Sequence, residues 1–322
     1  MVELGYTLSS EEHPPNDLVE HATRAEDAGF DFLSISDHFH PWTSQQGNSP
    51  FVWSTLGGVA HATDDIPVGI GVTCPIMRYH PTIVAQATAT VAAMLDGRFV
   101  FGVGTGELLN EHVVGEHWPE HAVRLEMLEE SVEIIRKLWT GDQVSHHGEH
   151  YSVQNARLFT LPEETPPILV SAYGKRSAQT AADIGDGFWS VGPQDTVDTW
   201  EDAGGDGPRY TQLQVCYAES EDEAVETAYE WWPNSALPGE LSAQLPTPVH
   251  FEQACQMVEK ADIAESSIVT SPDPEAHVES IQTAVDAGYD HVYVHQIGPD
   301  QEACFEFYEN EVFPAVENAD FG

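Results

Sequence analysis

Basic residues are scarce in this chain of 322 residues, where 11 Lys and Arg stand against 54 Asp and Glu for a formal net charge of −43. Nucleic acids and anionic membranes bind basic surfaces, so we expect neither as a partner. The acids concentrate in helix-like segments such as AESEDEAVETAYE, residues 218–230. Such a surface is typical of proteins of salt-loving archaea, because at 1 M salt a Debye length of about 3 Å screens the repulsion. An ordinary acidic bacterial enzyme is the alternative.

Long apolar runs and cysteine motifs are also missing. Without a run of about 18 apolar residues we expect no transmembrane helix, and without a basic, then apolar N-terminus no signal peptide, so the expected location is the cytoplasm. No CxxC pair occurs, so buried reduced thiols are predicted rather than zinc ligands or disulfides. The histidines of SHHGEH, residues 145–150, lie in a glycine-containing loop and indicate a solvated hairpin rather than a metal site. The four cysteines are Cys74, Cys216, Cys255 and Cys304.

Short β-rich runs alternate with longer helical patterns along the chain. Most of these runs are continuously apolar, as expected of parallel strands that are buried on both faces. Eight of them alternating with helices predict an α/β fold, a (β/α)8 TIM barrel, with a doubly wound sheet as the alternative. The predicted strands are 4–8, 32–36, 68–72, 99–103, 168–172, 187–191, 213–218 and 291–296. The predicted helices are 16–28, 53–63, 81–95, 121–139, 175–184, 220–232, 250–260, 274–287 and 301–312.

Two segments interrupt the regular alternation. The first insertion, near residues 105–165, contains a long helical pattern and then the segment VSHHGEHYSVQNARLF, which predicts a hairpin. The second, near residues 230–265, is rich in proline and aromatics and predicts a lid over the barrel mouth. No linker divides the chain, so residues 1–322 are predicted to form a single domain.

Polar and charged residues gather after the predicted strands. Active sites of TIM barrels lie where the strands end, so these residues are expected to meet. Taken alone, an aspartate such as Asp37 often only caps a turn, and a histidine such as His38 is more often structural. The whole group is therefore stronger evidence for an active site than any one of its residues. The first two strands are followed by Glu11, Asp37, His38 and Trp42; the third contributes Gly71, Val72 and Cys74; the fourth Thr105, Gly106, Glu107 and Asn110; the fifth Ala172, Tyr173, Gly174, Lys175 and Arg176; the sixth Val191 and Gln194.

Lys175 and Arg176 are two of only eleven basic residues. They follow a strand and open a predicted helix, where free backbone N–H groups and the helix dipole favour an anion. They therefore indicate a phosphate-bearing ligand, with a surface pair balancing local acids as the alternative. The strand ends supply a histidine base, an acid and an anion clamp, and the sequence shows no metal triad, nucleophile elbow or activated cysteine. This combination favours proton and hydride transfer around an organic cofactor. No metal is predicted.

Three segments carry a resemblance to a known family. SISDHFHPW (34–42), RYHPTIVAQATATVAAMLDGRFVFGVGTGELLNE (78–111) and DGFW (186–189) resemble the luciferase-like flavin and deazaflavin oxidoreductases. The group is that of the F420-dependent glucose-6-phosphate and secondary alcohol dehydrogenases. The resemblance covers nearly the whole chain and is densest over residues 1–140. It implies an elaborated (β/α)8 barrel, a homodimer, and coenzyme F420 lying across the barrel mouth.

The resemblance also implies residue roles. The position of His38 takes the substrate hydroxyl proton, while hydride passes from the same carbon to C5 of the deazaflavin. Glu107 acts at the N1 side of the reduced ring, and Trp42 shapes the pocket. Asp37 contacts the cofactor and orients the base, and Glu11 is a further pocket carboxylate. Gly71–Val72 is a non-prolyl cis peptide against the ring, and the remaining residues named at the third to fifth strand ends bind the cofactor.

The chain departs from this group where the sugar phosphate binds. Its three basic positions read SVGPQD with Gln194, LSAQLPTP, and ESSIV, none with a Lys or Arg. An unphosphorylated sugar, polyol or secondary alcohol is therefore expected, with Val191 and Gln194 as substrate contacts. Two cofactor positions also differ: Cys74 stands where a hydroxyl residue is usual, and Tyr173 with Gly174 replaces two glycines. The alternatives are an FMN-dependent monooxygenase, a glucose-6-phosphate dehydrogenase with a changed phosphate site, and a non-catalytic F420-binding protein.

Overall fold

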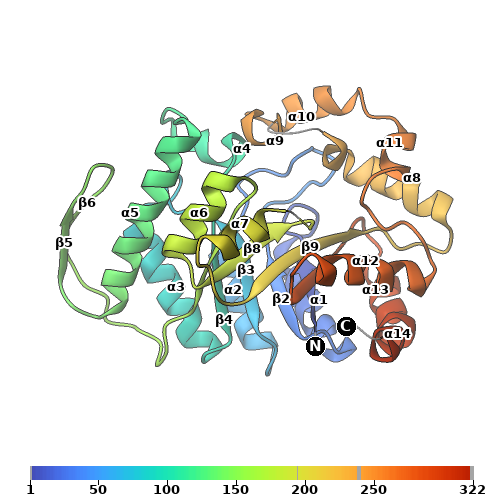
Figure 1. Cartoon of the computed structure of the whole chain (residues 1–322), viewed down its shortest axis with the longest axis horizontal. Coiled ribbons are helices and arrows are strands. Elements are labelled where there is room, and N and C mark those ends of the chain that lie inside the picture. The colour runs from blue at the N-terminus through green and yellow to red at the C-terminus, as the bar shows by residue number, and fades with distance from the viewer. Residues whose placement is uncertain (1, 194, 238–240, 320–322) are drawn as a thin grey trace.

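The eight predicted strands form a closed parallel barrel. The computed structural model describes residues 2–193, 195–237 and 241–319. Around the barrel the order is β1-β10-β9-β8-β7-β4-β3-β2, and helices lie outside it (Figure 1). The predicted TIM barrel is thus confirmed; β9 starts four residues earlier than predicted and β1 one residue earlier. The strands are β1 Glu3–Leu8, β2 Phe32–Ile35, β3 Val68–Thr73, β4 Phe99–Val103, β7 Ile168–Ser171, β8 Gly187–Val191, β9 Arg209–Val215 and β10 His291–Gln296.

Helices connect and surround these strands. The first begins with Pro15, whose fixed φ suits a helix start, and is capped after Ala28 by Gly29 with φ +96°. The larger helices are α1 Pro15–Ala28, α2 Val52–Ala62, α3 Pro81–Leu95, α5 His121–Trp139, α6 Lys175–Ile184, α8 Glu221–Trp231 and α12 Pro274–Asp286. The shorter ones are α4 Leu108–Glu111, α7 Thr196–Asp202, α9 Leu241–Gln244, α10 Pro248–Cys255, α11 Lys260–Ala264, α13 Gln301–Phe307 and α14 Phe313–Asn318.

Two predicted helices differ from the structure. The helix expected over 250–260 is split into α10 and α11, because a capping box between Glu259 and Asp262 starts a new helix. The helix expected over 301–312 passes through a π-helical turn, Tyr308–Val312, into α14. Pro314 in that continuation has no N–H to donate, so the regular hydrogen-bond ladder cannot run through it.

Aromatic side chains fill the barrel interior. Alternate strand residues face inward, and Phe32, Leu169, Trp189, Tyr210 and Tyr293 form this interior cluster. The Trp189 ring stacks on Tyr210 at 4.7 Å, and its Nε1 donates to the Tyr293 hydroxyl at 2.6 Å. A Cβ on Gly69 or Gly71 would lie 2.8 or 2.5 Å from the Trp189 ring, so glycine makes room for it. The remaining inward residues, nearer the carboxyl ends of the strands, are mostly polar.

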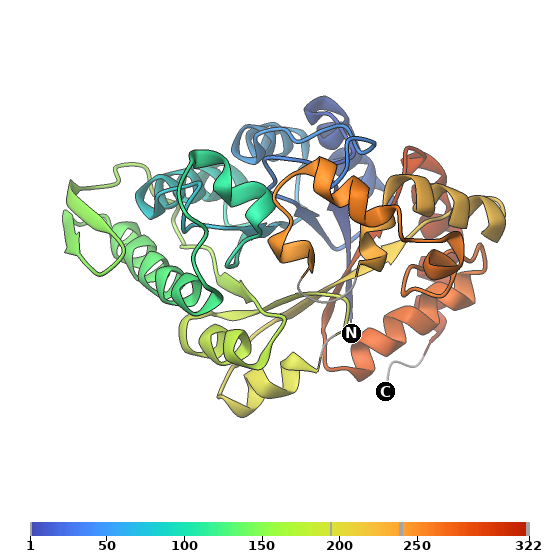
Figure 2. The same cartoon turned by 90° about the horizontal axis from the view of Figure 1, so that it is seen from above.

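Two segments depart from the simple alternation of strands and helices. The first holds α4, α5 and an antiparallel hairpin, β5 Val144–His147 with β6 Ser152–Ala156, which projects beyond α5 (Figure 1). His146 of this hairpin pairs with Glu130 of α5, Nε2 to Oε1 at 2.9 Å. The second holds α9, α10 and α11; seen from above, α9 and α10 cross the barrel (Figure 2). All four cysteines are buried and free, as predicted. Within the described ranges no helix has the length and apolarity to cross a membrane.

Candidate active site

His38 lies just beyond β2 with both ring nitrogens facing oxygen atoms. Nδ1 is 3.1 Å from the carbonyl oxygen of His40, and Nε2 is 3.2 Å from Oε1 of Glu11. The ring also packs edge-on against Trp42, with centroids 4.9 Å apart. A carbonyl and a carboxylate both accept hydrogen bonds, so Glu11 is placed to stabilise a proton on Nε2 of His38. The residues after β1 and β2 thus meet as the sequence predicted.

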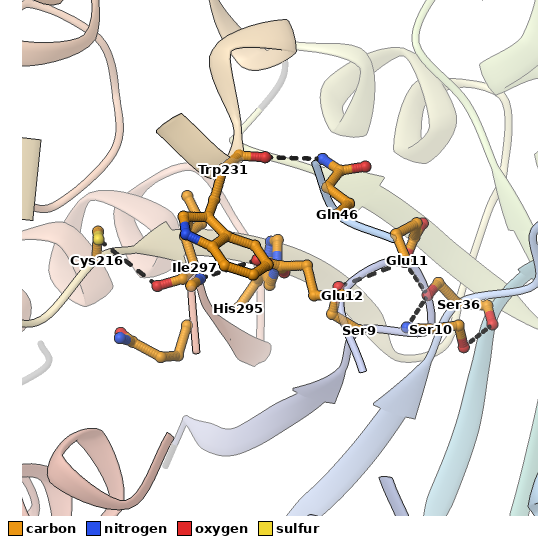
Figure 3. Close-up of polar contacts among 12 residues, drawn as sticks. Ser9, Ser10, Glu11, Glu12, Ser36, Gln46, Cys216, Trp231, His295 and Ile297 are labelled. Carbon is orange, nitrogen blue, oxygen red and sulfur yellow. Dashed lines mark hydrogen bonds and ion pairs between the residues drawn. The ribbon is translucent and has the colours of Figure 1, made fainter. Parts of the chain in front are cut away.

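Hydroxyl groups orient the Glu11 carboxylate towards His38. Its Oε2 accepts hydrogen bonds from Ser36 at 2.6 Å and from Ser9 at 3.4 Å (Figure 3). Ser36 in turn accepts from the backbone N–H of Ser10 at 3.0 Å. Glu11 is therefore a buried, positioned carboxylate, and among the described contacts it is Glu11 rather than Asp37 that touches the His38 ring.

Trp42 connects the site to the second insertion. Its ring meets Phe251 of α10 edge-on at 5.1 Å, and its backbone N–H donates to Gln46 at 2.8 Å. The Gln46 amide then donates to the carbonyl of Trp231 at 3.1 Å (Figure 3). It also donates to Asn234 at 3.2 Å. The predicted lid is thus tied to the loop that carries His38. Sequence patterns gave no sign of Gln46, since its partners are distant in the chain.

A buried cationic side chain holds the Asp37 carboxylate. Arg78 Nη2 lies 2.9 Å from Asp37 Oδ1, and the hydroxyls of Thr73 and Tyr79 also donate to this carboxylate. Arg78 further binds Glu111, through its backbone N–H at 2.9 Å and its Nε at 3.5 Å. Burial raises the pKa of Glu111 to about 7, against the opposing effect of Arg78. This network joins the ends of β2, β3 and β4; Arg78 and Glu111 lay inside a quoted motif without a predicted role.

The loop after β4 packs tightly on the end of β3. Gly106 has φ +69°, and a Cβ there would lie 2.6 Å from the Cys74 sulfur, so only glycine permits this approach. Burial, followed by the nearby Glu111 and Glu107, raises the pKa of Cys74 well above its usual range, which keeps it a neutral thiol. Thr105 and Glu107 are half-buried beside it. The Gly71–Val72 peptide is cis, as the resemblance implied.

Asn110 offers an unused donor in this loop. Its Oδ1 accepts from the backbone N–H groups of Phe39 at 2.9 Å and His40 at 3.2 Å. Its Nδ2 is buried and has no hydrogen-bond partner among the described residues. A buried donor without a partner calls for an explanation, and a ligand acceptor supplies one.

The end of β7 is open. Ala172 is buried, whereas Gly174 is exposed with free space around its Cβ position. Tyr173 is 58% exposed as a whole, yet burial around its hydroxyl, together with Glu107, raises the pKa of that hydroxyl. Val191 ends β8 and is partly exposed. Gln194 lies outside the described residues.

Lys175 and Arg176 are exposed in the first turn of α6. Within the described part of the chain neither has a hydrogen bond, an ion pair or an aromatic ring as partner. The other nine basic side chains all have such partners: Arg24, Arg78, Arg98, Arg124, Arg136, Lys137, Arg157, Arg209 and Lys260. In so acidic a chain, two cations left without acids at a helix start are suited to an external anion.

These features fit a planar, phosphate-bearing cofactor. Asn110 supplies a buried donor, the half-exposed Gly71–Val72 peptide supplies a surface, and the start of α6 supplies cations beside open space. Over residues 2–193, 195–237 and 241–319, no group of three or more His, Cys, Asp or Glu could hold a metal ion.

Comparisons with known proteins identify the family of this chain. A family model described as luciferase-like monooxygenase matches residues 2–291. F420-dependent glucose-6-phosphate dehydrogenases of Microbacterium testaceum and Segniliparus rotundus are 34% and 36% identical; the alignments cover 97% and 98% of this chain and 96% and 98% of theirs.

Solved structures add the fold and one further relative. An F420-dependent secondary alcohol dehydrogenase in complex with an F420–acetone adduct has a TM-score of 0.89 and 31% identity, with 98% of this chain and 99% of that chain covered. The F420-dependent tetrahydromethanopterin reductase of Methanopyrus kandleri, at 21% identity and a TM-score of 0.78 over 98% and 99% of the two chains, shares the fold. The chain belongs to the luciferase-like family.

Proposed function

We propose that this protein is an F420-dependent dehydrogenase that transfers hydride from the CH–OH carbon of a sugar or secondary alcohol to the deazaflavin C5. The observation that carries the proposal is the His38–Glu11 pair, 3.2 Å apart at the end of the barrel where the strands end. The relatives named as F420-dependent dehydrogenases, alike over their whole length, support the cofactor and the reaction class.

Coenzyme F420, when bound, supplies a deazaflavin carbon that accepts hydride. The Nδ2 of Asn110, the Gly71–Val72 backbone and the loop with Thr105, Gly106 and Glu107 are the groups that would hold its ring system. Lys175 and Arg176 would hold its phosphate end, with Gly174 leaving room for it. Cys74, a neutral thiol, would contact the ring side without ionising.

The contacts of His38 are suited to a general base. Nδ1–H donates to the His40 carbonyl, so Nε2 is the nitrogen that accepts the proton of the substrate hydroxyl. An alcohol carbon becomes a good hydride donor only as that proton leaves, so the base must stand beside the reacting carbon. The imidazolium that forms is then paired with Glu11, whose orientation by Ser36 and Ser9 is set before the reaction.

The lid favours an unphosphorylated substrate. Helices α9 and α10 contain no Lys or Arg. Lys260, the first residue of α11, is paired with Glu226. A sugar phosphate would therefore meet no free cation there, which separates this chain from a glucose-6-phosphate dehydrogenase. An FMN-dependent monooxygenase, the alternative within the family, has no need of an alcohol base.

The test is F420 reduction, followed as bleaching of its absorbance band in high salt with glucose, glycerol, 2-propanol and glucose 6-phosphate. We expect bleaching with an unphosphorylated alcohol. His38→Ala should lower turnover by about 10² to 10⁴-fold and change the Kd for F420 by only a few-fold. Lys175→Ala is the matched variant: it should raise that Kd about tenfold, since a charge-assisted contact is lost, and slow the chemistry less.

Two results would contradict the proposal. If His38→Ala abolished F420 binding together with turnover, His38 would be a binding group rather than the base. If the purified protein carried a yellow flavin and reduced no F420, the FMN-dependent alternative would replace it.

A further inference from the structure

A second carboxylate–histidine pair lies next to the first and has no role so far. Glu12, adjacent to Glu11, accepts from Nε2 of His295 at 2.7 Å and from the backbone N–H of Gly298 at 2.8 Å (Figure 3). Both side chains are buried, and Trp232 covers the His295 ring at a centroid distance of 4.5 Å. Two consecutive glutamates thus fix two histidines, His38 and His295.

The other nitrogen of His295 is left without a partner. Nε2–H donates to Glu12, and in this tautomer Nδ1 is an acceptor. His295 is 1% exposed, and no described residue reaches Nδ1. A buried acceptor of this kind costs free energy unless something donates to it.

A second unpartnered group faces the same space. The hydroxyl of Thr7 is 5% exposed and has no partner within the described residues. On β1 and β10 the outward residues Tyr6 and Val294 belong to the core shared with the helices, so Thr7 and His295 point into the barrel. Tyr6 is opposite Val294, and the register continued by one residue sets Thr7 beside His295.

The space they face is open to the barrel mouth. Interior neighbours on other strands, Gly71, Ser171 and Gln214, are partly exposed, although they line a closed barrel. The aromatic cluster around Trp189 fills the rest of the interior, so access comes from the end where His38 lies.

We propose that Thr7 and His295 bind a second hydroxyl of the substrate, which makes the substrate a polyol or sugar rather than a simple alcohol. This inference rests on the proposed function. A hydroxyl matches the pair because it donates to Nδ1 of His295 while accepting from Thr7. The adjacent carboxylates Glu11 and Glu12 then set the spacing between the reacting carbon, at His38, and the carbon that carries the second hydroxyl.

The test compares a polyol with a monoalcohol in isosteric variants. Thr7→Val removes the hydroxyl and keeps the shape; His295→Gln keeps an N–H for Glu12 and removes Nδ1. In each variant, we expect the ratio of kcat/KM for glucose or glycerol to kcat/KM for 2-propanol to fall about tenfold, because one hydrogen bond to a buried partner is lost. Thr211→Val is the control, since the Thr211 hydroxyl is equally buried and unpartnered but faces the helices on β9; its ratio should not change.

Other outcomes overturn the inference. An unchanged ratio means that no substrate hydroxyl reaches the pair. A raised Kd for F420 with an equal loss for both alcohols assigns the two atoms to the cofactor. A Tm of Thr7→Val well below that of Thr211→Val assigns them to a structural water. If no alcohol reduces F420, the proposed function fails, and saturation-transfer NMR with glucose then tests the hydroxyl site by itself. Glucose binding that is lost in Thr7→Val supports the site. No glucose binding to the unaltered protein excludes it.

Discussion

His13 is a buried histidine that should make the fold sensitive to acid. Its ring packs edge-on against His21 at 4.8 Å, and burial lowers its pKa from 6.5 to about 4. Between these values the unfolded chain binds a proton that the folded chain does not, so stability is lost as the pH falls from 6.5 towards 4. The loss at pH 4.5 is about 3 kcal/mol.

His13→Phe removes this titration and keeps a ring. Urea unfolding at pH 7 and pH 4.5, at one salt concentration, should show a smaller loss of unfolding free energy for His13→Phe than for the unaltered protein. His147→Phe, at an exposed position of the hairpin, is the control and should leave the loss unchanged. Equal losses in all three proteins would mean that His13 is protonated in the fold.

For single residues, the sequence predicted which of them lie together but not which side chains they contact. His38, Glu11 and Trp42 could be grouped because they follow strands whose carboxyl ends share one face. The roles of Arg78, Gln46 and His295 could not, since each depends on side-chain contacts between segments far apart in the chain. Asp37 shows the same limit: it follows β2, yet its carboxylate is bound by Arg78 and Thr73, and Glu11 is the carboxylate that touches the His38 ring.

Among the elements, α2 and α3 stand out because they carry no Asp, Glu, Lys or Arg over 11 and 15 residues. In a chain of net charge −43, two copies repel each other least where a surface carries no charged side chains. The outer side of α3 exposes Ile83 and Met94, and Phe51 is exposed just before α2. We therefore propose that the homodimer expected from the family resemblance forms through α2 and α3.

Ile83→Asp tests this proposal. Ile83 is 56% exposed, so the substitution should not disturb the fold, but it places a charge in the proposed contact. Sedimentation in high salt should then give a monomer where the unaltered protein gives a dimer. Val249→Asp, at a 54% exposed position on α10, is the control and should remain dimeric. A dimer that survives Ile83→Asp would place the contact elsewhere.

The strands and the longer helices were predicted well. All eight strands and the hairpin are present, because continuous apolar runs and turn residues mark them locally. The short helices α4, α7 and α9 were missed, since four to seven residues give too few repeats of the helical period. The division between α10 and α11 was also missed, although the sequence contains the capping residues Glu259 and Asp262.

For the whole molecule, the acidic surface predicts a fold that salt stabilises. Four acids, Asp195, Asp198, Glu201 and Asp286, line one surface hollow with no basic residue in its lining. At 0.1 M salt the Debye length of about 10 Å lets such charges repel; at 1 M it is about 3 Å and they are screened. We expect the Tm to rise steadily as KCl increases from 0.1 to 2 M, as in proteins of salt-loving organisms.

The double substitution Asp202→Asn with Asp286→Asn separates this effect from a general action of salt. Both acids are exposed at the C-terminal ends of helices α7 and α12, where a negative charge also opposes the helix dipole. The variant should melt several degrees above the unaltered protein in 0.1 M KCl, and the difference should shrink in 2 M KCl because screening removes the repulsion in both. A difference that is the same at both concentrations would mean that the gain is not electrostatic, because salt screens the helix dipole as well as the repulsion between acids. An unaltered protein whose Tm does not respond to KCl would contradict the expectation that its net charge limits its stability.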